Sequence, residues 1–153
     1  MLSRDGWLCH LCKRPVVLHL ALKYLDALVR EHGFTLPLAY WDPHWRRDAS
    51  PLLDELAASI DHVEAFARGG KHDLSNFAAV CARCNARKSA KLKDAYLKEN
   101  PPWKVKGLHG EPIHWDGLST LYVALAREKR DQLTATEKRW LNALEEQLER
   151  RAG

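Results

Sequence analysis

Four cysteines, arranged as two Cys-x-x-Cys pairs, are the residues of this chain whose spacing is most typical of a metal site. Cys9 and Cys12 form the first pair, and Cys81 and Cys84 form the second; the chain has no other cysteine. A Cys-x-x-Cys turn directs two sulfurs at one point, so two such turns supply the four thiolates of a tetrahedral zinc site. Because a long interval separates the pairs, the ion would join distant segments and act as a structural clamp.

Two disulfides, or four unrelated buried thiols, would give the same cysteine count. A disulfide across a Cys-x-x-Cys turn is usually redox-active, and a secreted chain normally begins with a signal peptide. This chain begins Met1-Leu-Ser-Arg-Asp and has no apolar run long enough to target or span a membrane. The sequence therefore favours structural Zn²⁺ and predicts a cytoplasmic protein that does not act at a membrane.

Polar residues suited to hydrolysis of a phosphodiester lie between the cysteine pairs and just after the second pair. That reaction needs a water deprotonated near neutral pH and a cation to neutralise charge on the phosphate. His62 is the candidate base, because histidine titrates in this pH range. Asp61 and Asn85 offer the oxygen ligands that suit Mg²⁺ or Mn²⁺.

The elements that must position these residues form a strand–turn–strand–helix order. Residues 59–64 and 76–80 are predicted as short strands, separated by a Gly69-Gly70 turn. Residues 82–97 are predicted as one helix, which Asn100 and two prolines end. The candidate residues would then meet on a single ββα unit.

Asp61 and His62 are neighbours within the first predicted strand. Neighbouring residues of a regular strand face opposite sides of a sheet, so the two cannot both face one phosphate. A bend or bulge at this point would resolve the conflict.

This ββα unit resembles the HNH endonucleases, also called ββα-metal nucleases, in their cysteine-bearing variety found in restriction and phage-type enzymes. The resemblance spans roughly residues 7–91 and includes an unusually long insertion between Pro15 and Ser59. The motifs that carry it are Asp61-His62-Val63, Gly69-Gly70, Asn76-Phe77, Cys81-x-x-Cys84-Asn85 and Lys88. It implies an intracellular prokaryotic or phage enzyme, a metal-dependent endonuclease that hydrolyses DNA.

The resemblance also implies a role for each residue of the motif. His62 would be the general base, Asp61 and Asn85 would bind the catalytic Mg²⁺ or Mn²⁺, and Asn76 would brace the loop carrying His62. The zinc held by the cysteines would take no direct part in catalysis.

Two positions depart from many relatives. Glu64-Ala65 stands where a proline often follows the histidine, so the loop leaving the first strand is expected to take a different path. Asn85 stands where a histidine is often found, and its amide oxygen favours a hard ion over zinc.

Basic residues concentrate in the same part of the chain, with 10 Lys and Arg against 5 Asp and Glu in residues 61–107. Arg83, Arg87 and Lys91 recur every four residues and would share one helix face, with Lys88 beside it. A solvated basic face would show the same pattern. We predict that this face contacts DNA phosphates, because the same helix carries a proposed metal ligand.

The predicted loop of residues 35–49 is a second candidate surface, because aromatic and basic side chains alternate in it. These side chains would either stack on bases and grip phosphates or pack over the first knuckle. They are Trp41, Trp45, Arg46 and Arg47.

Helices are predicted on both sides of the ββα unit. Residues 17–32 and 51–58 would form a helical insertion at about residues 16–58 of a nuclease domain that spans residues 1–100. Residues 119–132, capped by Ser119 or Thr120, and residues 134–150, which begin with a Thr134-x-x-Glu137 capping box, would form a C-terminal helical hairpin within residues 101–153. The hairpin would either cover the core or mediate a homodimer or docking on a larger complex. The fold class is therefore α+β: a small ββα-metal core with zinc knuckles, surrounded by helices.

His10, inside the first knuckle, could be a further metal ligand, but it is predicted to be exposed because four cysteines are already present. His72 and Asp73 could contact substrate, but they are predicted to lie in a solvated loop. A zinc-stabilised nucleic-acid-binding module without catalysis is the alternative function, and a structural or interaction protein is the third. Neither explains the catalytic cluster at nuclease spacing.

Overall fold

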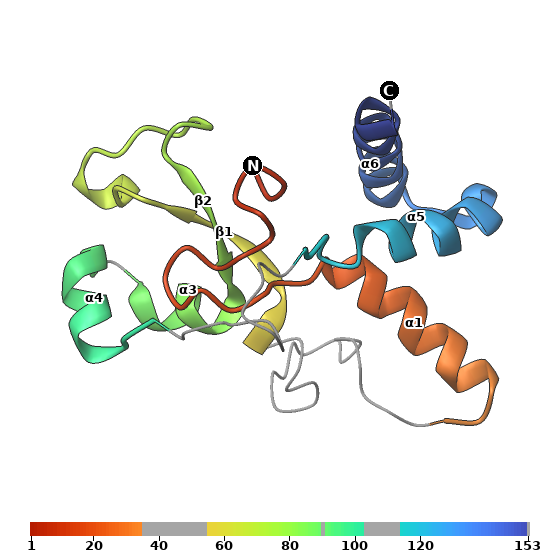
Figure 1. Ribbon diagram of the computed structural model, residues 1–153, viewed down its shortest axis with the longest axis horizontal. Helices are drawn as coiled ribbons and strands as arrows, with labels where there is room; N and C mark the ends of the chain where they lie inside the picture. The colour runs from red at the N-terminus through yellow and green to blue at the C-terminus, as the bar shows by residue number, and fades with distance from the viewer. Residues whose placement is uncertain (35–54, 90, 103–113, 153) are drawn as a thin grey trace.

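The computed structural model describes residues 1–34, 55–89, 91–102 and 114–152. A two-stranded antiparallel sheet is formed by β1 (Ala58–His62) and β2 (Phe77–Cys81). α3 (Ala82–Lys88) follows β2 directly and packs on both strands (Figure 1). This is the predicted ββα order, and the predicted mixed α+β class is confirmed.

The remaining helices lie on either side of the sheet (Figure 1). α4 (Lys93–Glu99) lies on the α3 side. On the other side, α5 (Ser119–Glu128) packs against α1 (His19–Glu31) and α6 (Ala135–Ala152). None of the described helices is long and apolar enough to cross a membrane.

The helix predicted over residues 82–97 is interrupted, so that prediction is wrong. α3 ends at Lys88, and Ser89 takes a left-handed backbone conformation with φ 48°. The next helix begins only at Lys93. Lys91 therefore lies between two helices, and it does not continue the helical face of Arg83 and Arg87.

The register of the sheet is continuous from one end of β1 to the other. Asp61 pairs with Ala78, and His62 pairs with Phe77, with no bulge between them. β1 is therefore regular at this point, with neither a bend nor a bulge, and the two side chains leave opposite faces of the sheet. Asp61 is buried beneath α3, whereas His62 is half-buried.

Helix starts in the C-terminal part are set by two acidic side chains. The predicted capping box is present, because Glu137 accepts hydrogen bonds from the Thr134 backbone and hydroxyl while its own N–H donates to Thr134 Oγ1. At α5 the predicted Ser119 or Thr120 cap is replaced by Asp116, whose carboxylate accepts hydrogen bonds from the backbone of Leu118 and Thr120. Asp116 precedes the apolar pattern by several residues, which is why the pattern alone did not identify it.

One hydrophobic core connects the N-terminal segment, β2 and the helices α5 and α6. Trp7 is fully buried there, and it packs so closely on Gly117 that a Cβ at this glycine would overlap the indole ring. Trp115 donates its indole N–H to the Val16 carbonyl across 2.6 Å.

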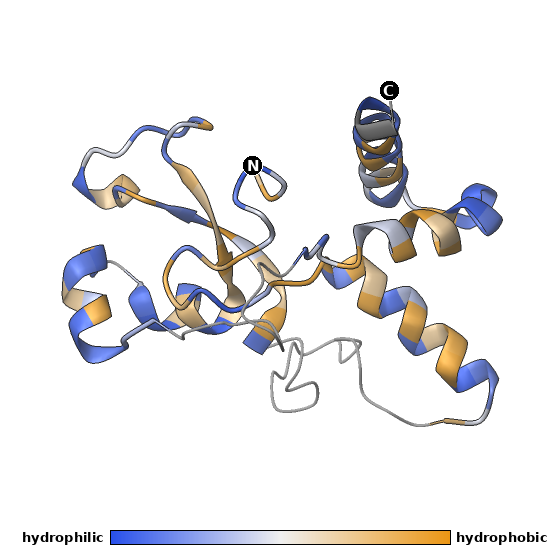
Figure 2. Cartoon of the chain, in the orientation of Figure 1, coloured by the Kyte–Doolittle hydropathy of each residue, from blue (hydrophilic) through white to orange (hydrophobic). Residues whose placement is uncertain are grey.

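α1 is amphipathic, as its bands of hydrophobic and hydrophilic residues show (Figure 2). The division into residues 1–100 and 101–153 stays a prediction.

Some of the predicted features lie outside the described residues. The aromatic and basic side chains Trp41, Trp45, Arg46 and Arg47 fall in residues 35–54, as does most of the helix expected over residues 51–58.

Candidate active site and metal sites

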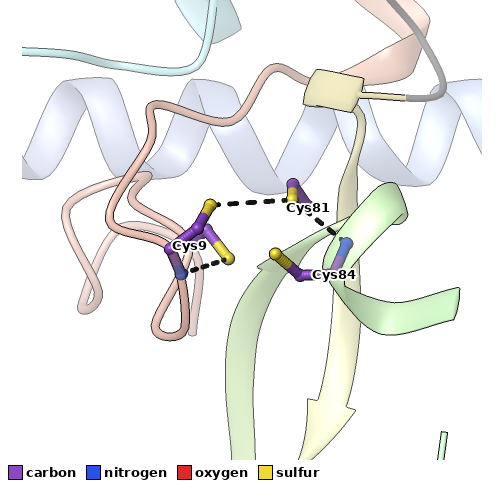
Figure 3. A group of neighbouring side chains, drawn as sticks. Cys9, Cys81 and Cys84 are labelled. Carbon is purple, nitrogen blue, oxygen red and sulfur yellow. Dashed lines mark hydrogen bonds between the residues drawn. The ribbon is translucent and has the colours of Figure 1, made fainter. Parts of the chain in front are cut away.

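The four cysteines converge on one point, although they come from distant parts of the chain. Cys9 lies in an N-terminal turn, Cys81 ends β2, and Cys84 lies in the first turn of α3 (Figure 3). Cys12 lies in the same N-terminal turn as Cys9. All four sulfurs lie within 4.8 Å of one another, and none forms a disulfide.

The spacing of the sulfurs fits a tetrahedral zinc site. Zn–S bonds of about 2.3 Å place neighbouring sulfurs roughly 3.8 Å apart, and Cys12 Sγ lies 3.9 Å from Cys81 Sγ. In each pair the second cysteine directs its backbone N–H at the sulfur of the first, at 3.5 Å for Cys12 and 3.4 Å for Cys84. These N–H groups favour thiolate over thiol, which is the form that binds metal.

The pKa shifts of the thiols differ in direction. Hydrogen bonds with Cys12 and Cys81 lower the pKa of Cys84 to about 7, whereas hydrogen bonds with the other cysteines raise the pKa of Cys81 above its usual range. Several thiolates packed this closely repel one another unless a cation lies between them. The geometry of the four sulfurs is therefore the observation that fits bound zinc.

A separate pocket of about 270 Å³ contains the other predicted site residues. Asp61 and His62 both contribute to its lining at the end of β1, although their side chains leave opposite faces of the sheet, and Asn85 and Lys88 line it from α3. The side-chain nitrogen of Asn85 donates to Ser59 Oγ at 2.9 Å, which fixes the orientation of its amide. A carboxylate and an amide in one pocket are a suitable donor set for a hard divalent ion.

Asp61 is the buried carboxylate of this pocket, and each of its two oxygens contacts a nitrogen of another side chain. Lys88 Nζ lies 2.8 Å from its Oδ1, and His10 Nε2 lies 2.8 Å from its Oδ2. Burial alone would raise the pKa of Asp61, but the hydrogen bonds from His10 and Lys88 outweigh this effect, and the pKa lies below its usual range. Asp61 is therefore a carboxylate at neutral pH, as a metal ligand must be.

His62 leaves the opposite face of the strand and is packed among ring side chains. Its ring meets the Phe77 ring edge-on at a centroid distance of 4.9 Å. Its Nε2 lies 3.1 Å from Nδ1 of His72, which comes from the loop between the strands. These contacts limit the rotation of the imidazole while leaving the side chain only half-buried.

Asn76 ties the loop after His62 to the start of β2. Its amide oxygen accepts a hydrogen bond from Glu64 N at 2.8 Å, and its amide nitrogen donates to the carbonyls of Glu64 and Lys71 at 2.9 and 2.8 Å. Gly70 is required beside it, because a Cβ there would overlap the Glu64 carbonyl and lie 2.9 Å from Asn76 Nδ2. The structure thus places Asn76 where it holds the backbone two residues beyond His62.

Residues 49–91 match the HNH endonuclease family model. The match contains the pocket, both strands, α3 and the second cysteine pair, so the resemblance seen in the sequence is confirmed for this HNH segment. The comparisons with curated proteins and with solved structures gave no match.

The predicted DNA-binding side chains differ in whether an acidic partner neutralises them. Arg83 forms an ion pair with Glu55, and Lys91 forms one with Glu99 at 2.7 Å. Arg87 is exposed and makes no ion pair within the described part of the chain. The predicted basic surface is therefore partly neutralised.

Lys88 and His10 correct the sequence-based assignments. Lys88 is 1% exposed and directs its ammonium at Asp61, so it does not belong to the exposed face on which it was predicted. His10 was predicted to be exposed, but its side chain is 12% exposed and contacts Asp61. Contacts between segments this distant in the chain give no periodic pattern in the sequence. The position of His10 inside the first Cys-x-x-Cys turn was the one sequence feature that could have indicated its role.

Proposed function

We propose that this protein is a metal-dependent HNH endonuclease that hydrolyses DNA phosphodiester bonds. The observation that carries the proposal is the shared pocket of Asp61, His62 and Asn85 within the HNH segment. A pocket that joins a candidate base to two oxygen ligands fits hydrolysis better than binding alone, because binding requires neither.

The proposed role of each site residue follows from its contacts. Asp61 and Asn85 would hold a divalent ion, Mg²⁺ or Mn²⁺, and such an ion would supply the positive charge that phosphodiester hydrolysis requires. His62 accepts the proton of the attacking water, and Asn76 fixes the backbone that follows it. Lys88 keeps Asp61 ionised inside the fold. The zinc held by the four cysteines stabilises the fold without joining the reaction.

Incubation with supercoiled plasmid tests this function. We expect nicked or linear DNA in the presence of Mg²⁺ or Mn²⁺, and none when EDTA is added. Asn85→Ala is expected to remove cleavage while keeping the fold and the zinc content, because Asn85 holds the ion but lies outside the hydrophobic core. Intact plasmid with the wild-type protein, together with retained DNA binding, would favour the non-catalytic binding module instead.

Affinity for DNA is expected to depend most on Arg87 among the predicted phosphate contacts. Arg83 and Lys91 already have acidic partners, whereas Arg87 has none among the described residues. Arg87→Ala should weaken binding on all sequences and reduce the slope of log K against log salt by roughly 0.9, the value for one lost phosphate contact.

Fluorescence anisotropy at several salt concentrations measures this slope. Lys138→Ala is the matched control, because Lys138 is also an exposed basic side chain on a helix but lies on α6. If the Arg87 variant kept both its affinity and its slope, DNA would bind elsewhere, and the surface around Trp41 and Arg47 would become the next candidate.

A further inference from the structure

His10 connects the cysteine cluster to the proposed catalytic pocket. It lies between Cys9 and Cys12, and its Nε2 approaches Asp61 Oδ2 at 2.8 Å. His10 is not among the residues that line the pocket, so it reaches Asp61 from the side of the knuckle. Its backbone is fixed as well, because His10 N donates to the Ala79 carbonyl of β2 at 2.8 Å.

Lys88 alone supplies a full positive charge beside Asp61. Lys88 already supplies an ammonium 2.8 Å from Oδ1, and one cation balances one buried carboxylate. His10 adds a contact to Oδ2, the second carboxylate oxygen of Asp61. With Oδ1 and Oδ2 held from two directions, the plane of the carboxylate is fixed relative to the pocket.

We propose that His10 is a positioning residue that orients Asp61 to receive a divalent ion. The inference rests on the proposed function, in which Asp61 is a ligand of that ion. Hydrogen bonds that orient a ligand typically contribute about 10–100-fold to metal affinity. Because the cysteine turn holds His10 on both sides, the zinc clamp fixes the geometry of the catalytic pocket as well as the fold.

Binding of Mn²⁺ to the full chain without DNA tests the proposal. Titration followed by the electron paramagnetic resonance of free Mn²⁺ gives the affinity directly, with no reliance on activity. His10→Leu should weaken binding by about 10–100-fold. His10→Gln should keep most of the affinity, because its side-chain amide retains an N–H donor near the position of Nε2. Both variants should keep four thiolates and therefore bind one zinc, as metal analysis would report.

A double-mutant cycle separates positioning from a structural role. Asp61→Asn should itself weaken Mn²⁺ binding, and adding His10→Leu should then change little, since His10 acts through Asp61. Wild-type affinity in a folded, zinc-loaded His10→Leu variant would overturn the proposal. Loss of zinc or of thermal stability in both His10 variants would also overturn it, because His10 would then be structural.

Different experimental results would overturn the proposed function and the proposed role of His10. A wild-type protein that neither binds Mn²⁺ nor cleaves DNA would overturn the proposed function. A wild-type protein that does both, with a His10→Leu variant of equal Mn²⁺ affinity, would overturn only the role of His10.

Discussion

His62→Ala is expected to reduce the rate of DNA cleavage by about 10²–10⁴-fold, the usual contribution of a general base. His62 is the only histidine among the described residues that line the pocket, so the variant removes the one imidazole available there as a base. DNA binding and zinc content should not change, because His62 touches neither the cysteines nor the exposed Arg87. Single-turnover cleavage of plasmid at saturating enzyme measures the rate without a contribution from binding.

His32→Ala is the matched control for this variant. His32 is an exposed histidine at the end of α1, and the same substitution there should leave the rate unchanged. His72→Ala is informative beside it, because His72 contacts the His62 ring and its loss should have a smaller effect than loss of the base itself. Cleavage by His62→Ala at the wild-type rate would remove His62 from the mechanism.

Cys84→Ser is expected to prevent stable folding. Structural zinc binds small domains with an apparent free energy of about 10–16 kcal/mol, which is comparable to the whole stability of a domain, about 5–15 kcal/mol. Cys84 is buried in the core at the start of α3, so loss of the ion would also release the helix that carries Asn85 and Lys88. Circular dichroism during thermal unfolding and zinc analysis of the purified protein measure the effect.

Cys84→His serves as the corresponding rescue variant, because an imidazole nitrogen is also a zinc ligand. It should retain more zinc and a higher melting temperature than Cys84→Ser. Zinc-free wild-type protein that stays folded and active, or a Cys84→Ser variant with the wild-type melting curve, would show that the cluster is not a structural zinc site.

The ββα unit is predictable because its signals are local. Asp61-His62, Asn76 and the second cysteine pair lie close together in the sequence, and both strands and the start of α3 appear within one or two residues of their predicted positions. The Thr134 capping box is local for the same reason, because its two members are three residues apart.

The features that could not be predicted depend on a single backbone conformation or on tertiary contacts. Ser89 ends α3 with φ 48°, and a serine at this point carries no strong helix-breaking propensity. The pairing of Asp61 with Lys88 and His10 joins three separate segments, so no periodic pattern predicts it. The sequence spacing predicted that Lys88 lies beside an exposed basic face. In the structure its ammonium instead contacts Asp61, the buried carboxylate of the pocket.

The distance between the two cysteine pairs has a consequence for how the protein is made. Cys12 and Cys81 lie 69 residues apart in the chain but meet in the same cluster of sulfurs. Since ribosomes add about 5–20 residues per second, Cys12 is synthesised roughly 3–14 seconds before Cys81. During that interval Cys9 and Cys12 have no partners, and an oxidant that joined them would remove half of the ligands. If the four cysteines bind zinc as proposed, the nascent chain would need reducing conditions during this interval, and the candidate site would be completed only after α3 has been synthesised.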